Sequence, residues 1–474
     1  MPARIRSSPQ NKFAWLILGL LIMQPCAVAE ATKPNIVFVL FDDMGWGQPQ
    51  SYNAESALRT QNLDHFAKEG MRFTDAHSAS AVCTPTRYGA LTGRYPWRIG
   101  RYGVLDTYSK PIIPPDRLTV ASLLKQQGYA TACIGKWHLG MNWGPRKKDA
   151  DPTVIPLGTK MTDGPNALGF DYFCGFTHAR NIGTVIEQDR VVAHVEPVEN
   201  QPLMLKKALE WIDRRKASEP FFLYFPMCPP HLPVVPAPEY VGKSGAEDRV
   251  KKDPQYGDWL FQGDAMLGRI LAALERNHLA ENTLVIAASD NGAEHRSYEP
   301  LRESKRSIYE GGHRVPFVVR WPGQVKPGSV NGHTVCLNDL LATVAEAIGA
   351  RLPDNAGEDS VSLLPEFRGT ATVGVREATV HQSSRGDLAI RQGPWKLVFL
   401  ADGAKELYNL ETDLSETKDL AATRPEVVAR MSALMQGYID NGRSTPGAPQ
   451  KNAVPVSLKG GRRQNPTEAS GEPE

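Results

Sequence analysis

The chain has 474 residues, which is long enough to bury a large hydrophobic core and to divide into two domains. Its formal net charge is only +2, so composition gives no argument for nucleic-acid binding, and we expect no nucleic-acid partner. The glycine, proline and aromatic contents are those of an ordinary globular enzyme with many loops.

The N-terminus is typical of a secretory signal. Basic residues precede the apolar run Phe13–Met23, and the small residues at 27–29 form a cleavage site. The apolar run is too short for a comfortable membrane span. We therefore predict a signal peptide over residues 1–29, no stable membrane anchor, and a mature protein that is periplasmic or secreted. A retained anchor is the alternative.

A pair of aspartates follows the first predicted strand. Residues 35–41 are almost continuously apolar, which predicts a strand that is buried on both faces. Asp42 and Asp43 come directly after it. At the carboxyl end of a buried parallel strand, these carboxylates stand where α/β proteins place their ligands. A solvated turn or a helix cap is the alternative.

Residues 83–94 read CTPTRYGALTGR and predict a helix that starts beside a cysteine. Thr84 is expected to cap a helix whose first position is Pro85, because proline is preorganised there. Backbone donors and the helix dipole favour an anion near Cys83, and Arg87 adds a planar cationic fork. The motif predicts a cysteine-derived group and an arginine that face a tetrahedral anion. A buried thiol before an ordinary helix is the alternative.

Three later strands are also followed by polar side chains: Lys136 and His138 after residues 129–134, His231 after residues 221–225, and Asp290 with Asn291 after residues 283–288. Helical patterns separate these strands, which implies a mainly parallel sheet with helices on both faces. The polar sets are therefore expected to gather at one edge of the sheet. Lys305 and His313 lie on a loop before another strand.

The pattern changes beyond Pro365. Short strand signals separated by Gly, Pro and Asp are followed by a helix over residues 425–440, which indicates a small antiparallel sheet packed with one helix. Composition argues for disorder at the C-terminus. The predicted fold is α/β, a large mainly parallel sheet between helices, with domains at 33–365 (catalytic), 366–441 (small α+β) and 442–474 (disordered tail).

The acidic residues at the strand ends have the chemistry of a metal site. Asp42, Asp43, Asp290 and Asn291 form an all-oxygen set with three negative charges. Hard cations such as Ca²⁺ and Mg²⁺ prefer these ligands, whereas zinc would need more histidine or cysteine.

The motif at residues 83–94 resembles the signature of the sulfatase family, with Thr86 where serine is commoner. The resemblance extends from about Asn35 to Leu420 and implies the alkaline phosphatase superfamily fold and hydrolysis of sulfate monoesters. It also implies that a formylglycine-generating enzyme converts Cys83 to formylglycine, the nucleophile. One metal ion is implied, Ca²⁺ with Mg²⁺ as the alternative, held by the four oxygen ligands above and the modified Cys83.

The resemblance also implies roles for the basic residues. Arg87 and Lys136 hold the modified residue and the sulfate oxygens. His231 with Lys305 protonates the leaving alcohol, and His138 assists the release of sulfate. For each lysine or histidine alone, a packed or surface residue is the alternative.

The substrate is expected to be a sulfated carbohydrate or an aryl sulfate. Candidate contacts are the long loop at 142–169 and the polar stretch at 177–181, in which His178 and Arg180 suit a sugar hydroxyl or carboxylate. His313 is a further candidate for the pocket, with an ordinary polar loop residue as the alternative. A solvated loop is the alternative for His178 and Arg180.

Two other functions fit the same fold. A phosphomonoesterase or phosphodiesterase would use Ser or Thr as nucleophile and two zinc ions, whereas this chain has Cys83 and an acidic set that suits one hard cation. A catalytically silent carbohydrate-binding relative is expected to have lost at least one polar member of the site, but all are present.

Overall fold

The computed structural model describes residues 1–4, 33–144, 151, 153–245 and 255–458. The chain divides into two units, Met1–Thr32 and Lys33–Glu474, and every element below belongs to the second. Apart from residues 1–4, the predicted signal peptide lies outside the described residues, as do residues 459–474 of the predicted tail. In the described part of the chain, no helix is long and apolar enough to cross a membrane.

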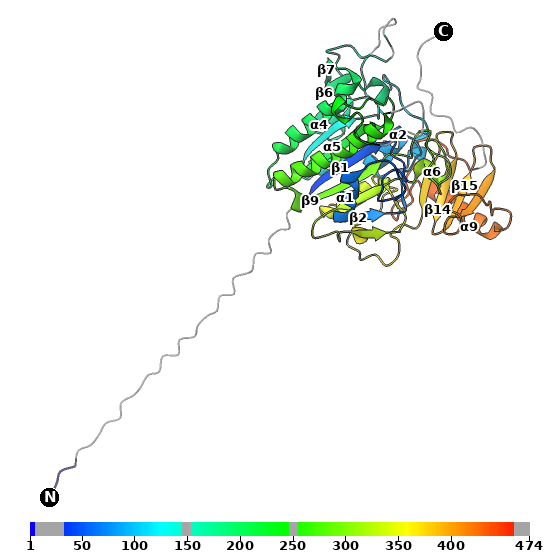
Figure 1. Cartoon of the computed structure of the whole chain (residues 1–474). Helices are drawn as coiled ribbons and strands as arrows, with labels where there is room; N and C mark the ends of the chain where they lie inside the picture. Colours follow the sequence, from blue (N-terminus) through cyan, green and yellow to red (C-terminus); the bar gives the residue numbers. More distant parts are fainter. Residues whose placement is uncertain (5–32, 145–150, 152, 246–254, 459–474) are drawn as a thin grey trace. The chain divides into compact units, whose positions relative to one another are not determined.

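Within the described residues, ten strands form one large sheet (Figure 1). Their order across it is β11 (Ser329–Asn331), β2 (Met71–Phe73), β10 (Phe317–Arg320), β9 (Thr283–Ser289), β1 (Asn35–Asp42), β8 (Phe221–Pro230), β4 (Ala130–Lys136), β5 (Tyr172–Phe176), β6 (Thr184–Glu187) and β7 (Arg190–His194). Strands β9, β1, β8, β4 and β5 are parallel, whereas β10, β6 and β7 pair antiparallel. The predicted α/β class is confirmed, with a mixed sheet.

Helices cover both faces of the sheet, which explains why β1 is buried at all eight positions. The helices that pack with Val37 and Val39 on one face are α1 (Gln61–Glu69), α4 (Pro197–Asp213) and α5 (Tyr256–Arg276). Those that pack with Phe38 and Leu40 on the other are α2 (Cys83–Thr92), α3 (Val120–Gln126), α7 (Leu340–Ala347) and α8 (Leu364–Phe367). In Figure 1, α4 and α5 lie side by side in front of the sheet.

The predicted small antiparallel sheet is present in the C-terminal part. Its strands, in sequence and spatial order, are β13 (Thr379–Gln382), β14 (Leu388–Gln392), β15 (Trp395–Phe399) and β16 (Lys405–Asn409). Met431 and Met435 of helix α9 (Pro425–Asp440) share a buried cluster with Leu397 and Phe399. Trp97 joins the same cluster, so the small sheet packs directly against the segment that follows helix α2.

The segment after α9 is tied to the rest of the chain. The backbone N–H of Ser444 donates to Asp359 Oδ1 at 3.1 Å, and Arg98 Nη1 donates to Asn452 Oδ1 at 2.8 Å. The prediction of disorder is therefore wrong for residues 442–458, because polar groups of this segment satisfy buried partners in the preceding chain.

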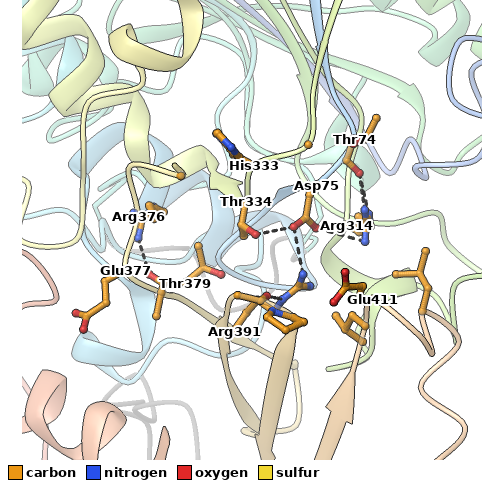
Figure 2. A pocket seen from close by; sticks show the side chains of 17 residues that line it. Thr74, Asp75, Arg314, His333, Thr334, Arg376, Glu377, Thr379, Arg391 and Glu411 are labelled. Carbon is orange, nitrogen blue, oxygen red and sulfur yellow. Dashed lines mark hydrogen bonds and ion pairs between the residues drawn. The ribbon is translucent and has the colours of Figure 1, made fainter. Parts of the chain in front are cut away.

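A polar pocket of about 490 Å³ lies beside β14 (Figure 2). Asp75 stands at its centre and accepts a hydrogen bond from Thr334 Oγ1 at 2.5 Å. Its oxygens also lie 3.3 Å from Arg314 Nη1 and 3.4 Å from Arg391 Nη2. The buried carboxylate of Asp75 thus links Arg391 of the small sheet to Arg314 and Thr334 of the preceding chain.

Candidate active site

Four adjacent parallel strands bring polar residues to one edge of the large sheet. Strand β1 ends at Asp42 and β4 at Lys136, while Asp290 follows β9 and His231 follows β8. The strand order is β9-β1-β8-β4, and carboxyl ends of neighbouring parallel strands share an edge. The structure therefore brings these side chains together at the place where the sequence predicted them.

Helix α2 presents Cys83 to this edge. It begins at Cys83 itself and has Val82 at the N-cap. Thr84 does not cap it, contrary to the prediction, because the Thr84 hydroxyl donates to the carbonyl of His138 at 2.9 Å. The bond ties the start of the helix to the end of β4. Cys83 Sγ lies 3.3 Å from Asp42 Oδ1 and 4.0 Å from Asp43 Oδ1.

Three buried cations face three buried carboxylates beside Cys83. The pairs are Arg87–Asp290, Lys136–Asp42 and Lys305–Asp43, with shortest N···O distances of 2.7, 2.5 and 2.6 Å. All six side chains are at most 3 % exposed, and their formal charges cancel. Cations at these positions can contact the oxygens of a bound oxyanion, while the carboxylates can ligate a metal ion.

The side chain of Asn291 tests whether the site fits a metal ion. Its Nδ2 donates to Asp43 Oδ1 at 2.7 Å. Its Oδ1 is buried and has no hydrogen-bond partner among the described residues. A buried acceptor without a partner is costly, and together with three carboxylates it completes the oxygen set that a hard cation prefers. Ligand atoms of Asp42, Asp43, Cys83 and His231 also lie within 4.8 Å of one another.

Two residues at the strand ends have left-handed backbone conformations. Asp43 has φ of 67° and His138 has φ of 57°, although neither is glycine. Tertiary hydrogen bonds hold both: the Asp43 N–H donates to Asp290 Oδ1 at 3.1 Å, and the His138 N–H donates to the carbonyl of Thr177 at 2.8 Å. Such conformations concentrate at functional sites, where surrounding contacts fix them.

His138 and His231 are held as neutral imidazoles. His138 Nε2 lies 3.0 Å from the carbonyl of Leu105, which can only accept, so Nε2 carries the proton. His138 Nδ1 then has a lone pair, and it has no partner in the described part of the chain. Burial and nearby Lys136 lower the pKa of His138, and burial and Lys305 lower that of His231. His231 Nε2 lies 3.7 Å from Asp43 Oδ2.

The thiol of Cys83 is a poor nucleophile in this setting. Burial and the carboxylates of Asp290 and Asp42 raise its pKa. Since the thiolate is the reactive form, an unmodified Cys83 stays protonated at neutral pH.

The pocket above Cys83 has a volume of about 650 Å³. His178 and Arg180, the candidate substrate contacts of the sequence, both line it and both follow β5 in the chain. His178 Nε2 lies 2.9 Å from Thr107 Oγ1, and exposed Arg180 pairs with Asp106 at 2.8 Å. Both residues are therefore positioned at the wall of the pocket.

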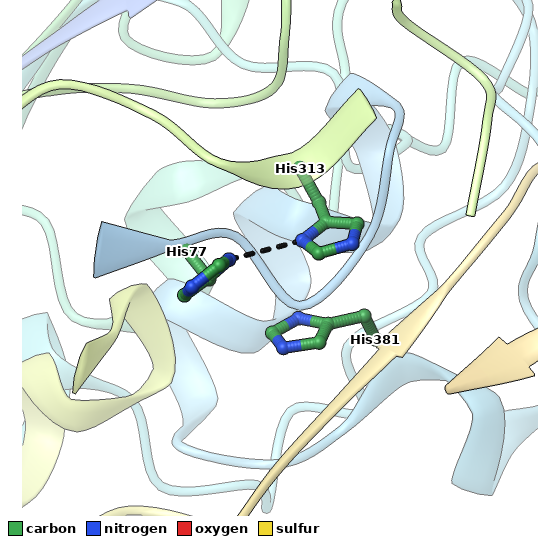
Figure 3. Close-up of side chains that lie close together, drawn as sticks. All are labelled: His77, His313 and His381. Carbon is green, nitrogen blue, oxygen red and sulfur yellow. Dashed lines mark hydrogen bonds between the residues drawn. The ribbon is translucent and has the colours of Figure 1, made fainter. Parts of the chain in front are cut away.

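His313 does not line this pocket, so the expectation that it reaches the substrate is wrong. It is fully buried in a cluster with His77 and His381 (Figure 3). Its Nδ1 lies 3.1 Å from His77 Nδ1, and its ring stacks on that of His381 with centroids 4.1 Å apart. Lys396 of β15 covers its other edge, with Nζ 3.1 Å from Nε2. Helix α6 (Glu310–His313) turns the side chain toward the small sheet.

Glu294 is a site residue that the sequence predictions missed. It lines the pocket and lies 3.3 Å from Lys305 Nζ and 2.6 Å from Arg306 Nη2. Burial favours its neutral form, but Lys305 and Arg306 prevail and lower the pKa of Glu294 to about 2. The sequence could have indicated Glu294, because it lies four residues after Asp290 on the same loop at the end of β9.

Comparisons with known proteins agree with this geometry. The family model Sulfatase matches residues 34–350, and the model N-sulphoglucosamine sulphohydrolase, C-terminal, matches residues 294–440. The chain is 31% identical to the N-acetylgalactosamine-6-O-sulfatase of Bacteroides thetaiotaomicron, over 85% of this chain and 93% of that protein. It is 32% identical to human arylsulfatase A, over 81% and 78% of the two chains.

A solved structure described under the metabolism of multiple glycosaminoglycans by Bacteroides thetaiotaomicron superposes with a TM-score of 0.78. It is 29% identical and covers 86% of this chain and 99% of its own. The chain belongs to the sulfatase family and is a sulfuric ester hydrolase.

Proposed function

We propose that this protein hydrolyses sulfate monoesters of carbohydrates through a formylglycine made from Cys83. The observation that carries the proposal is the position of Cys83 at the start of α2, with Sγ 3.3 Å from Asp42 and three buried cations beside it. Sulfatase activity on sulfated carbohydrates agrees with the relatives. N-acetylgalactosamine 6-sulfate is our first candidate, because one relative is named for that substrate.

The cations of the site would hold the sulfate group. Arg87 offers a planar fork, and Lys136 and Lys305 offer ammonium groups at the same edge. Their present partners are carboxylates, so binding of a metal ion to those carboxylates would free the cations for the sulfate oxygens. This exchange keeps the buried charges compensated.

Two groups that the chain acquires would supply the remaining chemistry. A formylglycine at position 83, once hydrated, would supply two hydroxyl groups, a nucleophile for sulfur and a group whose loss of a proton would allow sulfate to leave. One Ca²⁺, held by Asp42, Asp43, Asp290 and Asn291, would act as a Lewis acid on oxygen, and Mg²⁺ is the alternative.

The protein's own groups would move the protons. His231 with Lys305 would protonate the leaving alcohol, and the negative charge of a bound sulfate raises the otherwise low pKa of His231. His138 would accept a proton at Nδ1, the atom that has a lone pair and no partner in the described part of the chain.

The test is sulfate release by protein co-produced with a formylglycine-generating enzyme, with conversion of Cys83 confirmed by peptide mass. We expect release from N-acetylgalactosamine 6-sulfate or a related sulfated sugar, and none from Cys83→Ala. Phosphate release from phosphate monoesters by the same preparation, without sulfate release, would contradict the proposal. We also propose export after cleavage near residue 29, which N-terminal sequencing of the mature protein would test.

A further inference from the structure

A second hollow adjoins the pocket above Cys83. This hollow has a volume of about 930 Å³ and shares Lys305 and Arg306 with the pocket above Cys83. Pockets for a single small ligand typically measure about 300–1,000 Å³. The two hollows together therefore offer more space than one sulfated sugar requires, and they meet at the loop that carries Lys305.

The small sheet forms one wall of the second hollow. The residues come from the turns at 385–387, between β13 and β14, and at 400–402, between β15 and β16. The opposite wall is the loop at 295–309. The N–H of Ser384 donates to the carbonyl of Arg306 at 3.1 Å, which fixes the first turn against that loop. The shape of the hollow thus depends on both sheets.

Arg385 brings an unpaired cation to this wall. Its side chain is exposed, and its guanidinium has no hydrogen-bond or ion-pair partner within the described ranges. The other arginines of the two hollows are paired, Arg306 with Glu294 at 2.6 Å and Arg180 with Asp106 at 2.8 Å. A free guanidinium offers a planar, bidentate donor pair that matches a carboxylate or a sulfate.

Nearby acids leave this guanidinium free. Asp387 accepts from Ser383 Oγ at 2.6 Å and from the N–H of Ala401 at 2.9 Å, so its oxygens shape the turn. Glu303 and Asp402 are also lining residues of the hollow. Among the lining residues, the three carboxylates of Glu303, Asp387 and Asp402 balance the three cations, so the wall has no net formal charge, and Arg385 is its unpaired guanidinium.

We propose that Arg385 binds a carboxylate or sulfate on the sugar next to the one that carries the scissile ester. The inference rests on the proposed function and narrows its substrate class. The preferred substrate is an oligosaccharide with repeated negative charges, and a lone sulfated sugar or an aryl sulfate fills only the pocket above Cys83.

The kinetic test compares three probes. They are an aryl sulfate, N-acetylgalactosamine 6-sulfate, and a tetrasaccharide in which that sugar alternates with a uronate. Arg385→Ala should raise KM for the tetrasaccharide about ten-fold, the effect of losing one hydrogen-bonded contact to a charged group. It should leave kcat and the two smaller substrates unchanged, and Arg385→Lys should recover part of the loss. Arg269→Ala, at an exposed position of α5, is the matched control.

A binding measurement separates this inference from the proposed function. Tetrasaccharide binding is compared between Cys83→Ala and the double variant Cys83→Ala/Arg385→Ala, neither of which turns over. About ten-fold weaker binding by the double variant supports the subsite even if no probe releases sulfate, an outcome that would contradict only the proposed function. Equal binding by the two variants, or an equal kinetic loss on all three probes, would overturn the inference.

Discussion

Because the charges of the active site cancel, metal ion and sulfate should bind cooperatively. Asp42, Asp43 and Asp290 supply three negative charges, and three buried cations balance them. A divalent cation alone would leave the cluster at +2, and a sulfate dianion alone would leave it at −2. Together they restore neutrality, so each ligand should increase the affinity for the other.

The size of the effect follows from Coulomb's law. Two unit charges about 4 Å apart interact by about 1 kcal/mol at the dielectric constant of water, and by about half of that at about 8 Å. For two divalent ions the product of the charges is four times larger, so even at about 8 Å the attraction is about 2 kcal/mol. We therefore expect sulfate to tighten Ca²⁺ binding about 30-fold.

The assay is calorimetric titration of Ca²⁺ into metal-free protein at constant ionic strength, with sulfate or with chloride. Free Ca²⁺ is corrected for its ion pairing with sulfate. A separate thermal-shift measurement with sulfate and a chelator gives the stabilisation of the protein by sulfate in the absence of Ca²⁺. The reasoning is refuted if sulfate leaves the Ca²⁺ affinity unchanged or weakens it.

Three further predictions concern single side chains. Arg87→Ala should lower the stability of the metal-free protein by about 3–5 kcal/mol, because Asp290 would remain as a buried unpaired charge; a Tm about 3–5 °C lower would show this, and an unchanged Tm would contradict it. Burial raises the pKa of Glu416 from 4.5 to about 7, so the contribution of Glu416 to the free energy of unfolding should fall by up to about 3 kcal/mol as pH rises from 4.5 to 7. Glu416→Gln should remove this contribution, so urea unfolding of the variant should show a smaller loss of stability with rising pH than the wild type shows, and an identical pH dependence would contradict the prediction. Cys83→Ser should give at most a single turnover, since serine lacks the second hydroxyl; repeated turnovers in rapid-quench assays would argue against formylglycine chemistry.

The sequence predicted most of the fold because its main signals are local. Continuous apolar runs such as residues 35–41 and 283–288 are required of strands covered on both faces, and they became β1 and β9. The polar residues after each run could be placed at one edge, since parallel strands share their direction. The antiparallel pairing of β10, β6 and β7 at the flanks has no comparable sequence signal.

The missed features depend on tertiary partners. Thr84 has the residue type and position of a helix cap, but its hydroxyl finds the carbonyl of His138, a group 54 residues away in sequence. His313 lies only eight residues after Lys305, yet α6 turns it toward Lys396 of the small sheet. Neither the hydrogen bond of Thr84 nor the orientation of His313 could be predicted from propensity and spacing, because each depends on a contact between segments that are distant in sequence.

The two buried polar clusters differ in whether their polar atoms have hydrogen-bond partners. In the histidine cluster, every ring nitrogen of His77, His313 and His381 has a polar partner, so the cluster is satisfied without a ligand. The cluster at Cys83 is as deeply buried, but Asn291 Oδ1 and His138 Nδ1 have no partner in the described chain. An unpartnered acceptor in the interior costs about 1–3 kcal/mol. Binding of a metal ion and transfer of a proton would satisfy these two acceptors, which lie beside six buried charges.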